Sequence, residues 1–121
     1  MQEAAQKYRD VATQISSPRE LEATLLLRSA ARLQAIQDGW SDSSDKLEDA
    51  LFRNRQLWMV FLTAVTEKDS PLPVAIRQNV ANLGLFVLTH TLSLTINPRP
   101  ERLAPLIKIN REVATGLLGR A

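Results

Sequence analysis

The stretch LEDALFRNRQLWMVFLTAV, residues 47–65, carries an apolar repeat that decides the fold class of this chain. Positions 47, 51, 54, 58, 61 and 65 alternate in steps of four and three, and they read Leu, Leu, Asn, Trp, Phe and Val. This spacing places all six side chains on one face of an α-helix, as at the seam between helices of a bundle. The sequence therefore predicts a helix over about 46–67 that packs against other helices.

On both sides of this stretch, proline and glycine divide the chain into further helices. Ser17-Pro18-Arg19-Glu20 is a strong helix start, and with a stop at Gly39 it predicts a helix over 18–38. After Pro71-Leu72-Pro73, positions 76, 80, 83, 87, 90 and 94 repeat the seam and predict a helix over 73–96. Shorter helices are expected over 2–14 and, starting at Pro105, over 105–118.

These segments predict an all-α protein. Nothing in the 121 residues alternates like a β-strand, and the length fits one domain. We therefore expect residues 1–121 to form a single-domain antiparallel bundle of four to five helices. The helix over 73–96 is apolar on most sides and is expected in the middle of the bundle. Gly84 inside it is expected to mark the close approach of a neighbouring helix, and Asp45 with Glu48 to form a cap for the helix over 46–67.

Composition limits the classes of function. The chain has no cysteine, which excludes disulfides and thiol chemistry, and its 15 basic and 13 acidic residues form no basic stripe, so direct nucleic-acid binding is not expected. The first residues lack the layout of a secretory signal. The longest apolar-rich stretch, Leu83 to Ile96, is shorter than the ~20 residues that span a bilayer. We expect a cytoplasmic protein that does not insert into a membrane.

No residue pattern predicts catalysis. His90 is the only histidine, and its helix offers no further metal ligand, so it is expected to be a packed or hydrogen-bonded structural residue. There is no Walker loop and no G-x-S-x-G serine, and the acidic pairs fall at helix starts or in loops. The sequence predicts a protein that is not an enzyme, with no catalytic residue, no cofactor and no metal site.

Asn54 is the polar member of the first seam and allows two interpretations. In the first, it is buried and bonds to the backbone of another helix, which fixes the register of the bundle. In the second, Asn54, Arg55 and Trp58 line an incomplete seam that a partner helix completes, because Trp and Arg are frequent anchors of interfaces. The sequence leaves both interpretations open.

Asn110-Arg111 repeats this choice in the last helix, next to the apolar stripe that contains Ile109. These two residues either contact a partner or lie on a solvated face of the helix. The candidate partner-binding residues are Asn54, Arg55, Trp58, Phe61, Asn110 and Arg111.

Four blocks of sequence, taken in order, resemble a known family. They are Asn54-Arg55-x-Leu57-Trp58, Pro71-Leu72-Pro73, Leu83-Gly84-Leu85-Phe86-Val87-x-x-His90 and Leu106-Ile107-x-Ile109-Asn110-Arg111-x-x-Ala114-x-Gly116-Leu117, with an early Tyr8 before them. Together they resemble the flagellar protein FlaF of alphaproteobacteria, essentially from end to end.

This resemblance implies a cytoplasmic protein of flagellum assembly that is needed for flagellin production and export. It implies binding to flagellin as a secretion chaperone, together with FlbT, which restrains flagellin translation. The alternative is post-transcriptional regulation of flagellin expression through FlbT or flagellin messenger RNA. A helical bundle with an open apolar groove can hold an amphipathic segment, and the segment 2–14, with its thin apolar stripe, is expected to cover that groove until a partner displaces it.

Overall fold

The computed structural model describes residues 18–119, and the helix expected over 2–14 lies outside the described residues. The described residues are almost entirely helical and contain no strand, which confirms the all-α fold class. In chain order the elements are α2 (Pro18–Asp38), α3 (Trp40–Ser43), the 3-10 turn η1 (Ser44–Lys46), α4 (Leu47–Thr66), α5 (Val74–Ile96), the 3-10 turn η2 (Pro100–Leu103) and α6 (Ala104–Leu117). The bounds of the four long helices differ from the predicted ranges by at most one residue.

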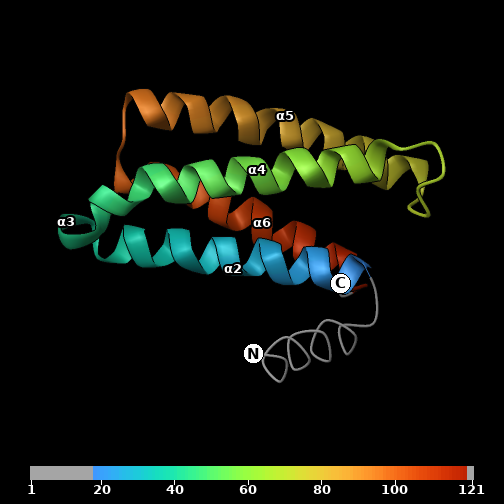
Figure 1. The fold of residues 1–121 in the computed structure, drawn as a ribbon, viewed down its shortest axis with the longest axis horizontal. Coiled ribbons are helices and arrows are strands. Elements are labelled where there is room, and N and C mark those ends of the chain that lie inside the picture. The colour runs from blue at the N-terminus through green and yellow to red at the C-terminus, as the bar shows by residue number, and fades with distance from the viewer. Residues whose placement is uncertain (1–17, 120–121) are drawn as a thin grey trace, which may run out of the picture.

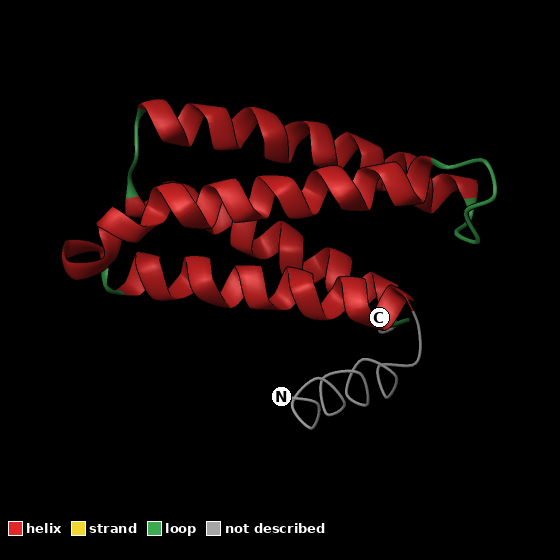
Figure 2. Cartoon of the chain, in the orientation of Figure 1, coloured by secondary structure: helices red, strands yellow, loops and turns green. Residues whose placement is uncertain are grey.

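The four long helices run up and down, each antiparallel to the one before it (Figure 1). Short connections join them at the two ends of the bundle (Figure 2). The contact between α2 and α6 is the most extensive, followed by the contacts of α4 with α5 and with α2. Helix α5 packs mainly against α4.

Alanines bring α2 close to its neighbours. Its buried stripe alternates small and large side chains: Ala23, Leu26, Ala30, Leu33 and Ile36. The stripe faces the buried residues of α6, among them Leu106, Ile107, Val113 and Ala114. Each leucine enclosed in this way contributes roughly 1.5–3 kcal/mol of hydrophobic stabilisation, so the apolar repeat of these helices is sufficient reason for their association.

Helix α5 lies at the edge of the bundle, and the prediction that it occupies the middle is wrong (Figure 1). It buries one narrow stripe, formed by Val80, Gly84, Val87, Thr91 and Leu94. Leu83 and Leu88 are partly buried, and most of its other large apolar side chains face outward, because within residues 18–119 only α4 and a small part of α6 cover it. A helix that is apolar on all sides belongs in a core only if neighbours surround it, and the helices of residues 18–119 are too few to do so.

The prediction for Gly84 is confirmed. A Cβ atom built on Gly84 would lie 2.6 Å from both Cδ atoms of Leu62 on α4. Side chains do not approach that closely, so the absence of a side chain here lets α4 and α5 pack together. The cost of a glycine within a helix is therefore offset at the contact with α4, the most extensive one that α5 makes within the described part of the chain.

The part of the chain that the structure describes contains one helix, α5, that is long and apolar enough to cross a membrane by length and composition alone. Its most apolar 18-residue window is 28% buried within the fold. Helices in the interior of soluble proteins meet the same criterion. That the chain does not insert into a membrane stays a prediction.

Candidate functional site

Three of the predicted partner-binding residues form a buried polar cluster between α2, α4 and α6. The side chains of Asn54, Trp58 and Asn110 have no exposed surface. Trp58 donates from Nε1 to Asn110 Oδ1 at 2.8 Å, and Asn110 donates from Nδ2 to Asn54 Oδ1 at 2.8 Å and to the Leu26 carbonyl at 3.4 Å. Ser29 on α2 also donates to Asn54 Oδ1, at 2.7 Å. We call these three residues and Ser29 the buried polar cluster.

The buried polar cluster decides between the two interpretations of Asn54. Phe61 is 2% exposed and meets Trp58 edge to face, with 5.5 Å between ring centroids. Since Asn54, Trp58, Phe61 and Asn110 are all enclosed by the bundle, the prediction that they line an open seam is wrong for this structure. Hydrogen bonds join these side chains across three helices, so they fix how the helices fit together. Asn54 Nδ2 is buried within the cluster without a hydrogen-bond partner. Asn54 bonds to side chains of its neighbours rather than to their backbone.

Arg55 and Arg111 are the two predicted residues that reach the surface, and they lie in different places. Arg55 lines a hollow between α4 and α5. Arg111 lies on the α2–α6 side of the bundle, where it approaches Gln34 Oε1 at 3.5 Å. The structure therefore does not bring the two arginines into one site.

Among residues 18–119, exposed large apolar side chains are most numerous on α5, and α2 and α4 carry three each. Half of the most exposed ones belong to α5: Val74, Ile76, Leu85, Phe86, Leu92 and Ile96. Leu85 and Leu92 are 69% and 64% exposed, and Phe52 and Met59 on α4 are 55% and 44% exposed. Each pair is spaced by seven residues, or about two helical turns, so each forms a stripe along its helix. We call Phe52, Met59, Leu85 and Leu92 the α4–α5 face.

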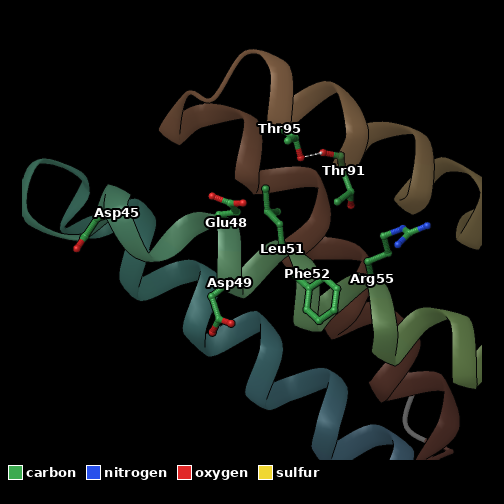
Figure 3. Close-up of a pocket in the computed structure, with 8 residues that line it drawn as sticks. All are labelled: Asp45, Glu48, Asp49, Leu51, Phe52, Arg55, Thr91 and Thr95. Carbon is green, nitrogen blue, oxygen red and sulfur yellow. Dashed lines mark hydrogen bonds between the residues drawn. The ribbon is translucent and has the colours of Figure 1, made fainter.

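The α4–α5 face is hollowed at one end, where a depression of about 510 Å³ lies between the two helices (Figure 3). Phe52 and Arg55 line it from α4, and Thr91 and Thr95 line it from α5 (Figure 3). Both threonine hydroxyls donate to carbonyls of their own helix, at 2.6 Å and 3.0 Å. Their hydrogen bonds are thus already made, and with Leu51 they add methyl groups to the lining.

Acidic residues surround the end of this depression that is nearest α3. Asp45, Glu48 and Asp49 line it, and Asp49 pairs with Arg53 at 2.8 Å. The predicted cap formed by Asp45 and Glu48 is absent: α4 begins at Leu47 after Lys46, without a side-chain cap. The reason is that η1 leads directly into α4, and the Leu47 amide already bonds to the Ser44 carbonyl.

A second hollow, of about 240 Å³, lies between the start of α5 and the end of α6. It is lined mainly by apolar residues, among them Leu72, Ile76, Leu83 and Leu117. Further along α5, His90 Nε2 donates to the Arg102 carbonyl at 2.7 Å, and its ring stacks on Phe86. The prediction of a hydrogen-bonded structural histidine is confirmed, and this bond ties α5 to η2.

Within residues 18–119 no group of three or more His, Cys, Asp or Glu side chains could hold a metal ion. What these residues offer is an apolar face with charged groups at its rim, which is suited to binding another macromolecule. The chain matches the family described as flagellar protein FlaF over residues 4–117. It belongs to the FlaF family. No curated protein and no solved structure matches it.

Membership in the FlaF family makes this a flagellum-related protein. Four residues of the candidate site were not predicted as binding residues from the sequence: Phe52, Met59, Leu85 and Leu92. A signal for two of them was present, because Leu85 and Leu92 belong to a second stripe of α5 that is offset from the predicted seam. The apolar repeat alone could not show which of the two stripes the other helices cover.

Proposed function

We propose that this FlaF family protein binds flagellin in the cytoplasm as a secretion chaperone and thereby supports flagellin synthesis and export. The observation that carries the proposal is the exposed α4–α5 face, in a protein of a flagellar family. Apolar surface of this kind on a small protein is typical of a site for another protein. This face replaces the buried seam as the proposed binding surface.

The shape of the α4–α5 face suits a helical segment. Helix α5 has 23 residues, which corresponds to a length of about 34 Å. An amphipathic helix laid along α4 and α5 would bury its apolar side against Phe52, Leu85 and Leu92, in the helix-in-groove mode of recognition. A flagellin segment that is amphipathic and not yet assembled needs such cover for its apolar stripe.

The leading test measures binding of the full-length protein to its own flagellin. Size-exclusion chromatography with light scattering should give a stoichiometric complex, and calorimetry its dissociation constant. Leu92→Glu places a charge on the α4–α5 face and should weaken binding at least about tenfold. The matched control is Leu27→Glu on α2, since Leu27 is also an exposed leucine, at 41%, and its binding should not change.

Two results would contradict the proposal. One is the absence of any complex with flagellin. The other is equal affinity of wild type and Leu92→Glu, which would place the binding site elsewhere. Flotation with vesicles of phosphatidylcholine and phosphatidylglycerol tests a lipid surface as the competing occupant, because α5 is long and apolar. Binding to vesicles without binding to flagellin would replace the proposal.

The alternative function is regulation of flagellin expression through FlbT. A second surface, separate from the α4–α5 face, favours this alternative. The surface of α2 and α6 around Gln34, Lys108 and Arg111 is hollowed and lies away from α5. It would stay accessible to a second protein when the α4–α5 face is occupied. Arg111→Glu should then weaken binding of FlbT, measured by pull-down, and leave binding of flagellin unchanged. A loss of both would indicate a shared site.

A further inference from the structure

We infer that the α4–α5 face selects its helix by charge: a Lys or Arg of the bound segment reaches Asp45 and Glu48, and an apolar side chain next to it enters the depression beside Phe52. The inference rests on the proposed function, since it describes the segment that the same face would hold. It adds a requirement of sequence and register that apolar contact alone does not impose.

The carboxylates of Asp45 and Glu48 are available for such a contact. Among residues 18–119, the ion pairs are Arg19–Glu22, Arg53–Asp49 and Lys108–Glu112, so neither carboxylate is paired. They also do not cap α4. Two neighbouring negative charges without a counter-ion, at the rim of an apolar depression, favour a cationic side chain at that position.

Arg55 gives the depression a second, positive end. It follows Glu48 by seven residues, which places it about 10 Å further along α4. Arg55 makes no ion pair with the carboxylates of residues 18–119. A helix that carries a basic and an acidic residue about two turns apart, with apolar residues between them, would match both ends. The lining between the ends is apolar, because Phe52 and Leu51 lie there and the hydroxyls of Thr91 and Thr95 are bonded within α5.

The test uses two 18-residue amphipathic peptides with the same leucine stripe, one with two lysines at one end and one with glutamines there. Fluorescence anisotropy with the full-length protein should show that the lysine peptide binds about three- to tenfold more tightly. The preference should shrink at high salt. The double variant Asp45→Asn/Glu48→Gln should lose it, and its affinity for flagellin should fall by a similar factor.

The matched control is Glu67→Gln/Asp69→Asn. It also removes two negative charges, but beyond the opposite end of α4, and it should retain the preference for the lysine peptide. If both double variants behave alike, only net charge acts and the inference is overturned. Leu92→Glu should weaken both peptides equally, and unchanged binding would also overturn the inference. Melting curves of all variants confirm that the compared proteins are folded.

Other occupants of the face give distinct results. Sedimentation at increasing protein concentration would reveal a dimer. If Leu92→Glu dissociates that dimer, the face binds a second copy of the chain. A peptide of residues 2–15 that displaces the lysine peptide would assign it to the chain's own first segment. Each result would overturn the inference. Absence of flagellin binding, with the peptide preference intact, would refute the proposed function alone.

Discussion

The buried polar cluster and the outer side of α5 are opposites in the same small molecule. Around Asn54, Trp58 and Asn110, polar side chains are enclosed and joined by hydrogen bonds across three helices, and Asn54 Nδ2 alone among their polar atoms has no partner. On α5, apolar groups such as Leu85 and Leu92 are exposed to solvent. Polar residues inside determine how the helices fit together, and apolar residues outside remain for a partner. The comparison teaches that residue type at a seam does not by itself locate a binding site.

The largest expected effect breaks the interior. Trp58→Ala should lower the free energy of unfolding by about 3–5 kcal/mol, because Trp58 is fully enclosed and its removal leaves a cavity. Urea denaturation followed by circular dichroism measures the loss. Trp40→Ala serves as a control, since Trp40 is only partly buried, and it should cost less. A loss below about 1 kcal/mol for Trp58→Ala would mean that the tryptophan is not part of the core.

A smaller loss tests the polar cluster itself. Asn110→Ala should destabilise the protein by about 2–3 kcal/mol, because it removes the acceptor of Trp58 Nε1 and one of the two donors to Asn54 Oδ1 within the core. The same denaturation measurement applies. Asn82→Ala, on an exposed position of α5, should change stability by less than about 0.5 kcal/mol. Equal effects of the two substitutions would argue against paired hydrogen bonds around Asn110.

The contact that joins the two regions can be tested at Gly84. Gly84→Ala should destabilise by about 1 kcal/mol, since the strain of overpacking against Leu62 exceeds the gain in helix propensity. Gly116→Ala is the matched control on α6: its added Cβ meets no atom within 4 Å, so it should stabilise by up to about 1 kcal/mol. Thermal melting reports both. Stabilisation by Gly84→Ala would show that α4 and α5 are further apart.

The smallest effect is expected on the outer side of α5. Leu85→Gln should change the free energy of unfolding by no more than about 0.5 kcal/mol, because Leu85 is 69% exposed. Val87→Ala, two residues away on the buried stripe of the same helix, should cost about 1–3 kcal/mol. Chemical denaturation of the two variants side by side measures the contrast. A large loss for Leu85→Gln would mean that part of this chain already covers the face.

The sequence by itself determined the helices and their ends. Proline, glycine and the four-three repeat act over a few residues, so the four long helices and the role of Gly84 could be predicted without tertiary information. The four blocks of sequence likewise indicated the FlaF family before any fold was known.

Only the tertiary structure decided which apolar stripe is buried. On α5, two stripes offset around the helix are both rich in apolar residues, and the choice between them depends on how many neighbours the helix has. The same holds for Asn54 and Trp58 on α4. They are enclosed by residues of α2 and α6 that are more than 20 positions away in the sequence. Burial is a property of the assembled helices, because a side chain leaves water only when another element covers it.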